Sequence, residues 1–387
     1  MKYLSENLVQ GKTVLLRCDF NVPVKDGIIT DDSKIIKSLE TIKFLLENEN
    51  KVIIFSHFGR VKKEEDKQKN SLKIVYEELK KYIDVIFIND NEHLEDEFNH
   101  LDSRCFLVEN TRFTDVPEKR ESSNDLELAN YWASFGDVFV LDAFGSMHRS
   151  HTSTAGISKF LPTYIGFLAE KEIKNLNELV ENKEMPLVVI MGGAKVDDKI
   201  KIIKSMLEKC DKLVLTGGIL NTFLKVLGKN VGNSLVSEDE EVLKEVKEVI
   251  NNSFDKLKYS EEFVVNSNGE ILKKNIDEIN DNDIIYDNII DLNGILNGKE
   301  LVFFNGTCGK YEEQEYNIGT KKLLMDLYNS GSKVFVGGGD TVSAANTFGY
   351  EDKFYYLSSG GGATLEYVAY GKLKALEWIK ENSVEKQ

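Results

Sequence analysis

Polar and charged side chains, most of them cationic or able to donate hydrogen bonds, follow short apolar segments in the first half of the chain. They are Asp19 and Asn21 in RCDFNVP, His57 and Arg60 in SHFGR, Arg112 in ENTRF, and His148, Arg149 and His151 in DAFGSMHRSH. Guanidinium groups donate hydrogen bonds in a fork that matches phosphate and carboxylate oxygens. Several cationic groups in an otherwise acidic chain therefore predict a site for a small, multiply anionic molecule.

Glycine loops follow the apolar segments of the second half. They hold Gly192, Gly193, Lys195 and Lys199 in GGAKVDDKI, Gly217 and Gly218, Asn305 and Gly306, and the run Gly337 to Asp340. Glycines after strands let main-chain N–H groups and helix N-termini approach phosphates closely. Lys195 and Lys199 have the spacing of one helical turn, so we expect them to point the same way. The set is typical of a nucleotide triphosphate site, although neither GxxxxGK[ST] nor GxGxxG occurs.

Both sets of loops require a scaffold of parallel strands. Apolar runs predict buried strands at 13–18, 51–56, 85–88, 105–108 and 138–141, and again at 187–191, 212–216, 301–304 and 333–336. Between the first two, a helical stripe contains Ile35, Ile36, Leu39, Ile42, Leu45 and Leu46. Repeated strand-helix-strand units predict an α/β protein whose parallel sheets are covered by helices on both faces. Ligands collect outside the carboxyl ends of such strands, which is where both sets of loops fall.

Composition narrows the possible partners. The chain has 65 acidic and 49 basic residues, a formal net charge of -16, which argues against nucleic acid or an anionic membrane as a partner. The four cysteines are widely spaced without a CxxC pair, which disfavours a disulfide framework and a zinc site. No apolar run approaches the ~20 residues of a membrane span, and no signal peptide precedes the first strand, so we expect a cytoplasmic protein.

The length of 387 residues predicts two domains. The best connector is residues 166–186, a helical pattern that ends at a proline leading into a new strand. The first domain is therefore expected to span residues 1–165.

Eight stretches resemble the signatures of the phosphoglycerate kinase family, in order and at fitting separations. They are RCDFNVP, SHFGR, LVENTRF, DAFGSMHRSHTSTAGI, GGAKVDDKI, FNGTCG, GGGD and SSGGGATLE. The resemblance implies two Rossmann-like domains, with a phosphoglycerate domain at 1–165, a connecting helix at 166–186 and a nucleotide-binding domain at 187–362. It also implies that residues 363–387 return to the first domain.

The same resemblance implies an activity. Phosphoglycerate kinases reversibly transfer a phosphoryl group from 1,3-bisphosphoglycerate to ADP in glycolysis, giving 3-phosphoglycerate and ATP, with Mg²⁺. The expected partners are therefore small-molecule substrates, and we expect a monomer. The attacking oxygen belongs to an ionised carboxylate, so no general base is needed. Two anionic substrates must meet away from water, and we expect the domains to close about residues 166–186.

Individual roles are implied in the same way. The substrate-binding residues are Asp19, Phe20, Asn21, Lys34, His57, Phe58, Gly59, Arg60, Arg112 and Arg149, with His148 and His151 beside them. The nucleotide-binding residues are Gly193, Lys195, Lys199, Gly217, Asn305, Glu312, Gly338, Gly339, Asp340 and Thr341, with Glu312 at the ribose and Asp340 at the metal. The catalytic residues are Lys34, Lys199 and Arg149.

Several positions depart from the family pattern. Lys34 replaces an arginine that helps to neutralise the transferring phosphate, and lysine lacks the planar fork. Thr307 replaces a proline, TGGIL at 216–220 replaces GGGM, and the stretches YSEEFVV and DNDIIYDNIIDLN lack Pro-Val-Asp and Gly-Pro elements near the purine. The alternatives are therefore a paralogue with weak, altered or lost catalysis that acts in binding or regulation, and, more distantly, a dehydrogenase.

Overall fold

The computed structural model describes residues 1–98 and 103–384. The chain forms two compact units, one made of Met1–Lys174 with Lys372–Gln387 and the other of Asn175–Gly371. The division falls within helix α6 (Phe167–Val180), which runs through the expected connector. The functional domain limits drawn from the sequence stay predictions. Among the described residues, no helix has the length and apolar character needed to cross a membrane.

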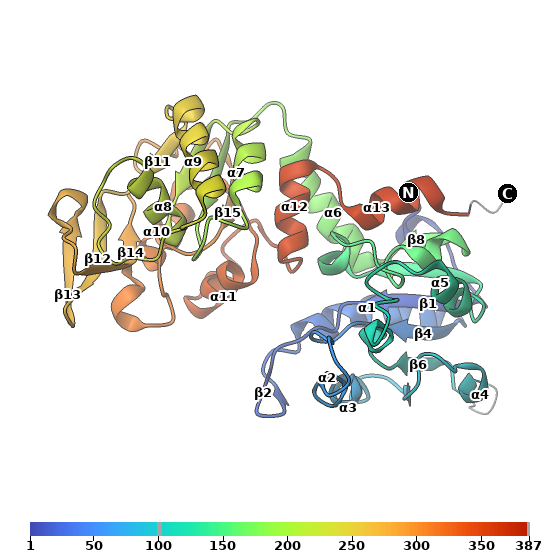
Figure 1. Ribbon diagram of the computed structural model, residues 1–387. Coiled ribbons are helices and arrows are strands. Elements are labelled where there is room, and N and C mark those ends of the chain that lie inside the picture. The colour runs from blue at the N-terminus through green and yellow to red at the C-terminus, as the bar shows by residue number, and fades with distance from the viewer. Residues whose placement is uncertain (99–102, 385–387) are drawn as a thin grey trace. The chain divides into compact units, whose positions relative to one another are not determined.

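The first unit is built on a six-stranded parallel sheet (Figure 1). Its strands are β1 (Thr13–Cys18), β4 (Lys51–Phe55), β5 (Ile86–Ile88), β6 (Cys105–Val108), β7 (Val138–Asp142) and β8 (Thr163–Ile165), in the spatial order β5-β6-β4-β1-β7-β8. The centre is nearly all apolar, and Leu16 of β1 pairs with Ile54 on one side and Val140 on the other. All five strands predicted in this half are confirmed. The short edge strand β8 was not predicted, because its three residues carry no apolar run.

Helices and a hairpin complete the first unit. They are β2 (Val24–Lys25), β3 (Ile28–Ile29), α1 (Ser33–Glu47), α2 (Asp66–Lys69), α3 (Lys73–Leu79), α4 (Glu95–Phe98), α5 (Leu126–Ala133) and α13 (Lys374–Asn382), with short 3₁₀ turns η1 (Leu4–Glu6), η2 (Thr111–Asp115), η3 (Phe144–Ser146) and η4 (Gly156–Lys159). Helix α1 buries Ile35, Leu39, Ile42 and Leu45 as predicted. Ile36 was wrongly placed on that stripe, since its side chain is 46% exposed.

The last segment of the chain belongs to the first unit. After helix α12 (Gly362–Tyr370), the backbone N–H of Ala375 donates to the carbonyl of Met147 at 3.0 Å, and that of Val384 donates to the carbonyl of Ser158 at 3.3 Å. Helix α13 buries Leu376 on the face that packs there. These contacts lie beside the loop that carries Arg149.

The second unit has its own six-stranded parallel sheet. The strands are β9 (Leu187–Met191), β10 (Lys212–Leu215), β11 (Leu257–Tyr259), β15 (Leu301–Asn305), β16 (Lys333–Val336) and β17 (Tyr356–Leu357), in the order β11-β10-β9-β15-β16-β17. The helices are α7 (Ile200–Leu207), α8 (Gly217–Val226), α9 (Glu240–Ser253), α10 (Ile318–Ser330), α11 (Gly339–Thr347) and α12 (Gly362–Tyr370), with turns η5 (Ile276–Glu278) and η6 (Gln314–Tyr316). The four strands predicted in this half are confirmed.

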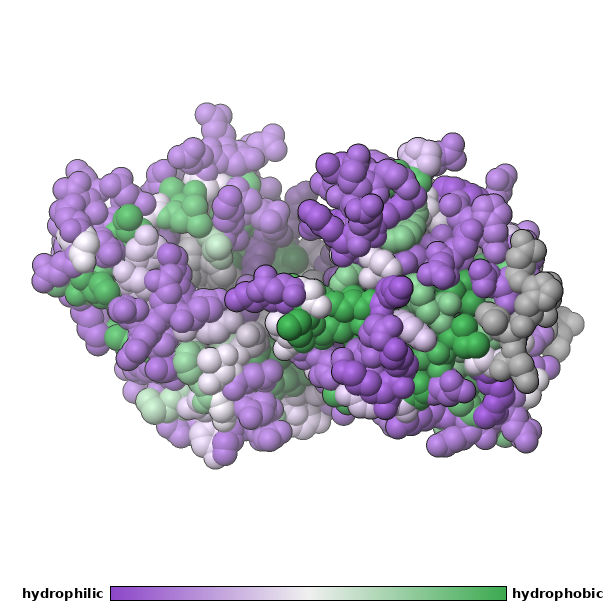
Figure 2. All heavy atoms as spheres, turned by 90° about the horizontal axis from the view of Figure 1, so that it is seen from below, coloured by the Kyte–Doolittle hydropathy of each residue, from purple (hydrophilic) through white to green (hydrophobic). Residues whose placement is uncertain are grey.

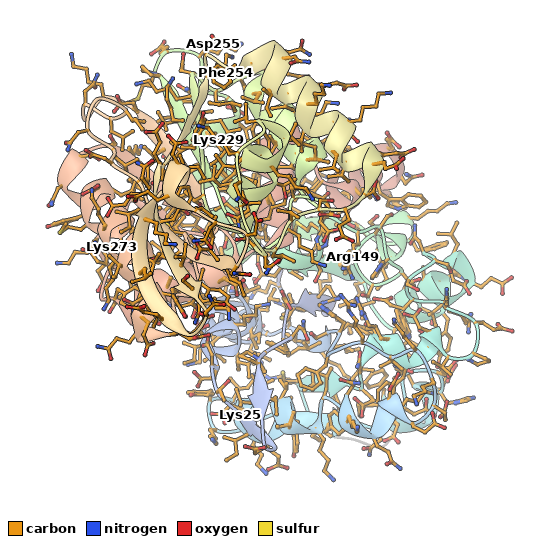
Figure 3. All side chains as sticks on the ribbon, turned by 60° about the vertical axis from the view of Figure 1, so that its left-hand side comes forward. Lys25, Arg149, Lys229, Phe254, Asp255 and Lys273 are labelled. Atoms are coloured by element: carbon orange, nitrogen blue, oxygen red, sulfur yellow. The ribbon has the colours of Figure 1, made fainter. Side chains whose placement is uncertain are left out.

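A separate antiparallel sheet occupies the segment that the sequence left unassigned. Strands β12 (Glu262–Ser267), β13 (Glu270–Asn275) and β14 (Asp283–Ile289) pair in the order β13-β12-β14. Strand β13 is polar and mostly exposed, and its Lys273 is labelled in Figure 3. An edge strand of this composition has no apolar pattern to predict it. The face shown in Figure 2 is mostly hydrophilic with scattered apolar residues, as expected for a chain this acidic.

Candidate functional site

Four strands of the first sheet end close to the predicted substrate residues. Asp19 follows β1, His57 follows β4, Arg112 lies in η2 after β6, and Arg149 lies just beyond η3 after β7. Because all these strands are parallel, their carboxyl ends meet at one edge of the sheet. The structure therefore brings these side chains to one edge of the unit.

Arg17 belongs to this cluster, and our sequence reasoning missed it. Its side chain is 1% exposed near the end of β1, and its Nε donates to the hydroxyl of Ser153 at 2.7 Å. Its Nη1 donates to the carbonyl of Cys18, and its Nη2 lies 3.1 Å from Nδ1 of His57. The available signal was a single cation within the apolar strand TVLLRC, since a buried arginine requires several partners.

The histidine next to Arg17 is neutral. A guanidinium only donates, so Nδ1 of His57 must accept and the ring proton resides on Nε2. Burial and then the charge of Arg17 hold the pKa of His57 well below its ordinary value. His57 can therefore donate through Nε2 to an anion without carrying charge itself.

Asp19 and Lys34 form an ion pair, with 3.0 Å between Lys34 Nζ and Asp19 Oδ2. Burial alone would raise the pKa of Asp19, but the charge and hydrogen bond of Lys34 and the charge of Arg17 lower it to about 2. The lysine that replaces the family arginine thus keeps its charge next to Asp19. It offers a single ammonium group there instead of a fork.

The loops between these groups are fixed by backbone contacts. The side chain of Asn21 accepts from the N–H of Gly59 at 2.9 Å, and the carbonyl of Gly59 accepts from Arg112 Nη1 at 3.1 Å. Gly59 has φ +59°, and a Cβ there would lie 1.9 Å from Oδ1 of Asn70. Only glycine therefore fits at this position without displacing the loop.

Two phenylalanines of the predicted set act through their backbone. The N–H of Phe20 donates to Ser56 Oγ at 2.9 Å, and the N–H of Phe58 donates to Asn110 Oδ1 at 3.1 Å. Both side chains are buried in the core of the unit. These residues hold the loops that carry the polar groups.

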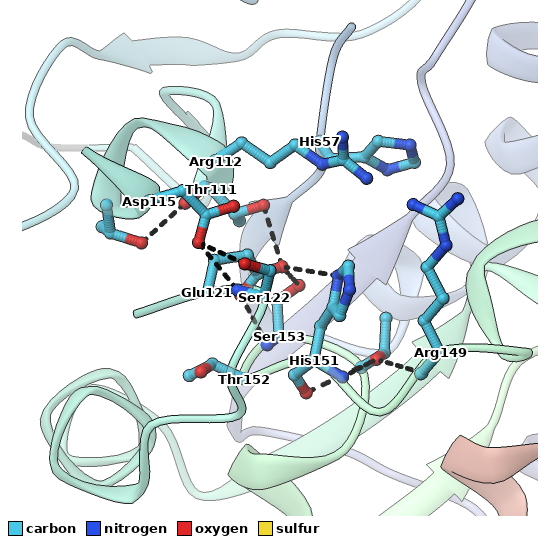
Figure 4. A network of polar contacts seen from close by, with 12 residues as sticks. His57, Thr111, Arg112, Asp115, Glu121, Ser122, Arg149, His151, Thr152 and Ser153 are labelled. Carbon is cyan, nitrogen blue, oxygen red and sulfur yellow. Dashed lines mark hydrogen bonds and ion pairs between the residues drawn. The ribbon is translucent and has the colours of Figure 1, made fainter. Parts of the chain in front are cut away.

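Arg112, Arg149 and His151 extend toward the same region (Figure 4). Burial lowers the pKa of Arg112, and repulsion from Arg149 lowers it further. Nε of Arg112 is buried and has no hydrogen-bond partner among the described residues. Arg60 lies exposed on the loop after β4, and Arg149 is also exposed. Repelling cations with an unmet donor are the features expected of an anion site.

The two histidines beside Arg149 are held neutral as well. Burial and the charge of Arg149 lower the pKa of His148 to about 4, and burial and the charge of Arg112 lower that of His151 to about 4. Nε2 of His148 lies 3.1 Å from Nε of Arg149, which can only donate. The positive charge of the cluster therefore comes from its arginines and Lys34 at neutral pH.

In the second unit, three glycine loops pack against one another. A Cβ on Gly192 would lie 2.6 Å from the carbonyl oxygen of Thr307, one on Gly218 2.1 Å from the carbonyl oxygen of Ala194, and one on Gly306 2.2 Å from the carbonyl carbon of Gly192. These approaches leave no room for side chains. The loops after β9, β10 and β15 thus form a continuous main-chain surface.

Lys199 lies at the centre of that surface. Its Nζ donates to the carbonyl of Gly192 at 2.8 Å and to Oδ1 of Asn305 at 2.9 Å, and burial lowers its pKa. Lys195 lies exposed in the preceding loop. The expectation that the two lysines share a helical turn is wrong, because helix α7 begins only at Ile200.

The GGGD run forms the start of helix α11. Gly338 has φ +94° at the N-cap, and Gly339, Asp340 and Thr341 form the first turn. The hydroxyl of Thr341 accepts from the N–H of Gly306 at 2.6 Å, which ties this turn to the loop after β15. The free N–H groups and dipole of such a turn favour bound anions.

Two adjoining cavities open on these loops. The larger, of about 500 Å³, includes Gly217 and Glu312 in its lining, and the smaller, of about 230 Å³, includes Lys199, Asn305, Gly338, Gly339 and Thr341. Gly193, Thr307 and Asp340 line both. Every predicted nucleotide residue except Lys195 therefore lines one of the cavities. Their sizes and their contact suit a base with its ribose next to a phosphate chain.

The segment that departs from the family pattern lines the larger cavity. Ile284, Ile285 and Tyr286 of β14 contribute apolar wall, and Lys310 Nζ lies 4.1 Å from the centre of the Tyr286 ring. Asn288, which our sequence reasoning also missed, is buried and accepts from the N–H of Gly217 at 2.8 Å. A cavity thus forms without the missing Gly-Pro element.

The chain matches the family model described as phosphoglycerate kinase over residues 4–372. It is 43% identical over 398 residues to the phosphoglycerate kinase of Macrococcus caseolyticus, covering 98% of this chain and 99% of that protein, and 43% identical over 388 residues to that of Enterococcus faecalis, covering 96% and 97%.

Solved structures agree with these relatives. The phosphoglycerate kinase of Coxiella burnetii superposes with a TM-score of 0.83 at 32% identity, and that of Pyrococcus horikoshii superposes with a TM-score of 0.83 at 26% identity, each covering 98% of both chains. The fold expected from the sequence is confirmed. The names of these relatives support the prediction of a phosphoglycerate kinase and not the alternative of a paralogue that has lost catalysis. The chain belongs to the phosphoglycerate kinase family.

Proposed function

We propose that this chain catalyses reversible phosphoryl transfer from 1,3-bisphosphoglycerate to ADP, giving 3-phosphoglycerate and ATP. The observation that carries the proposal is the presence, in one chain, of an arginine cluster with an unmet donor at Arg112 and a glycine-lined double cavity with Lys199 inside it. The first suits a small phosphorylated acid and the second suits a nucleotide. We further propose a cytoplasmic, monomeric enzyme of glycolysis that needs neither nucleic acid nor membrane.

In the glycerate site, the proposed roles follow from charge. Arg60, Arg112 and Arg149, with Nε2 of His57, would bind the phosphate that is not transferred, and Asp19 with Asn21 would hold the glycerate hydroxyl and carboxylate end. Phe20, Phe58 and Gly59 would position these groups through the backbone. Lys34 and Arg149 would offset charge on the transferring phosphoryl group.

In the nucleotide site, Lys199 and Lys195, Asn305 and the α11 turn would bind the phosphates, and Glu312 would bind the ribose. Asp340 lines both cavities at the helix N-terminus, and Mg²⁺ is commonly held by one or two carboxylates together with substrate phosphates, so Asp340 fits such an ion. When bound, the ion would offset phosphate charge. Among residues 1–98 and 103–384, no cluster of three metal-ligating side chains occurs.

The reaction needs positioning and charge and no proton transfer. The attacking group is a carboxylate or a phosphate oxygen, each ionised at neutral pH. Neutral His57, His148 and His151 are therefore consistent with roles as hydrogen-bond donors. Direct transfer requires both substrates to meet in a site without water, which excludes hydrolysis of the acyl phosphate.

A coupled assay with 3-phosphoglycerate, Mg²⁺ and either ATP or GTP tests the proposal. We expect turnover by the wild-type chain, and Lys34→Arg should retain or increase kcat because the guanidinium fork restores orientation at the transferring phosphoryl group. Nucleotide binding by calorimetry without turnover, unchanged in Lys34→Arg, would instead support a paralogue that has lost catalysis. The ATP and GTP arms establish the purine preference.

A further inference from the structure

A buried carboxylate lies directly behind the arginine cluster. Glu121, in the turn before α5, is 0% exposed. Its Oε2 accepts from the N–H of Ser153 at 3.0 Å, and its Oε1 accepts from the hydroxyl of Thr111 at 3.1 Å and from the hydroxyl of Ser153 (Figure 4). Each of these groups donates to Glu121, which therefore acts only as an acceptor.

The hydroxyl of Ser153 connects Glu121 to Arg17. Nε of Arg17 donates to Ser153 Oγ at 2.7 Å, and since a guanidinium cannot accept, the single proton of Ser153 is left for Glu121. The direction of this chain of hydrogen bonds is thus fixed from Arg17 through Ser153 to Glu121. Such polarised chains are stronger than their isolated members.

Glu121 is also a counter-charge for Arg17. The direct partners of Arg17 are neutral, namely the Ser153 hydroxyl, the carbonyl of Cys18 and the ring of His57. Burial lowers the pKa of Arg17, and the charges of Glu121 and then Asp19 oppose that shift. A guanidinium buried at 1% exposure requires such an anion nearby, because an unpaired charge in the interior is strongly destabilising.

The same carboxylate reaches the other loops of the site. Thr111 immediately precedes Arg112 in η2, and Nδ1 of His151 lies 4.0 Å from Oε1 of Glu121. One buried anion therefore ties together the end of β1, the η2 turn and the loop after β7. The charge of Glu121 also opposes the repulsion from Arg17 that lowers the pKa of Arg112.

We propose that Glu121 is a positioning residue that fixes, through Ser153 and Thr111, the arrangement of Arg17 and Arg112 needed to bind the phosphate of 3-phosphoglycerate. The inference rests on the proposed function and refines its substrate site. Glu121 does not touch the substrate, and its effect is confined to the first unit.

The test uses Glu121→Gln, which keeps the size of the side chain but removes its charge. It also replaces one acceptor oxygen by an NH₂ group, which cannot accept from Ser153 or Thr111. We expect KM for 3-phosphoglycerate to rise about tenfold, the equivalent of ~1.4 kcal/mol in binding, with kcat and KM for ATP within about twofold of wild type. The matched control is Glu300→Gln. Glu300 is also a buried carboxylate and accepts N–H bonds from Asn297, Gly298 and Lys299, but it lies in the second unit at the start of β15.

Glu300→Gln should lower the melting temperature without changing either KM. Ser153→Ala removes only the connecting hydroxyl and should raise the same KM. Adding it to Glu121→Gln should cause no further rise, because Ser153 acts through its contact with Glu121. Ser153→Ala alone also carries the test if Glu121→Gln does not fold, since it leaves the charges of Arg17 and Glu121 in place.

Three outcomes separate this inference from others. An unchanged KM for 3-phosphoglycerate in folded Glu121→Gln and Ser153→Ala overturns it. An equal rise of the KM values for 3-phosphoglycerate and for ATP in Glu121→Gln, together with a loss of stability as large as that of Glu300→Gln, also overturns it. That result would indicate a purely structural role. Absence of turnover in the wild type would refute the proposed function, and titration calorimetry with 3-phosphoglycerate would then still decide whether Glu121 governs binding of that anion.

Discussion

Replacing Lys199 with alanine should disable phosphoryl transfer while leaving the fold intact. In the structure the ammonium contacts two neutral oxygens, those of Gly192 and Asn305, at 2.8 and 2.9 Å. No carboxylate lies within ion-pair distance of it among the described ion pairs, and Asp340 acts on it only over a longer range. The charge of Lys199 is therefore available to a bound phosphate.

The size of the effect follows from this geometry. An ammonium about 4 Å from a phosphate charge contributes ~4 kcal/mol at an effective dielectric constant of about 20. In the alanine variant, water fills the space left by the lysine and hydrates the phosphate, which offsets part of this lost attraction. Hydrogen bonds to charged groups contribute ~1.5–3 kcal/mol in practice. We therefore expect kcat/KM for ATP to fall about a hundredfold, since each 1.36 kcal/mol corresponds to about a factor of ten.

The assay is steady-state turnover with ATP and 3-phosphoglycerate as varied substrates, with melting temperatures measured in parallel. Lys201→Ala is the matched control, because Lys201 is an exposed lysine on helix α7 that lines neither cavity. It should stay within about twofold of wild type, as surface substitutions usually do. A Lys199→Ala enzyme within threefold of wild type would refute the assignment of the smaller cavity to the nucleotide phosphates.

Three further predictions concern the first unit. Arg60→Ala should raise KM for 3-phosphoglycerate about tenfold through loss of a phosphate contact and leave ATP binding unchanged, whereas equal losses would contradict separate sites. Gly59→Ala should lower the melting temperature and weaken 3-phosphoglycerate binding together, because φ is +59° and a Cβ would collide with Asn70, and a melting temperature equal to wild type would disprove that constraint. His148 and His151 have pKa values of about 4 in the folded state against an ordinary 6.5, so the unfolded chain binds more protons between these values and stability should fall as pH drops from about 6.5 to 4. Melting temperatures across that range check the sign, and bound 3-phosphoglycerate should reduce the fall because its charge favours the imidazolium form.

The parallel sheets could be predicted because their strands are continuous apolar runs. Every such run identified in the sequence forms a strand, and the parallel order then places His57, Arg112 and Arg149 at one edge. The antiparallel sheet of β12, β13 and β14 could not be predicted, since β13 is polar and its pairing depends on a partner that is also irregular. Short edge strands and the 3₁₀ turns depend on tertiary contacts that no local pattern records.

Prediction of the site failed where burial decides the role of a residue. Arg17, Glu121 and Asn288 appear ordinary in sequence, as an arginine in a strand, a glutamate in a polar turn and an asparagine in an unassigned segment. Each is nearly fully buried and contacts a residue of one of the two proposed sites. Lys195 is the opposite case, in which a sequence pattern was clear but misleading. Its spacing from Lys199 predicted a shared helical face, whereas both lysines precede helix α7.

Electrostatics explain how so acidic a chain can bind two anions. At the proposed glycerate site, burial keeps the neighbouring histidines neutral and makes the arginines the source of charge, and the pKa of Arg112 is lowered by burial and by repulsion from Arg149. An anion bound between the guanidinium groups would relieve that repulsion. The proposed nucleotide site instead offers main-chain N–H groups and Lys199, which contacts the neutral oxygens of Gly192 and Asn305. Because Arg112 has an unmet donor and Lys199 contacts only neutral oxygens, the positive charge of each proposed site is available to a phosphate although the chain as a whole is acidic.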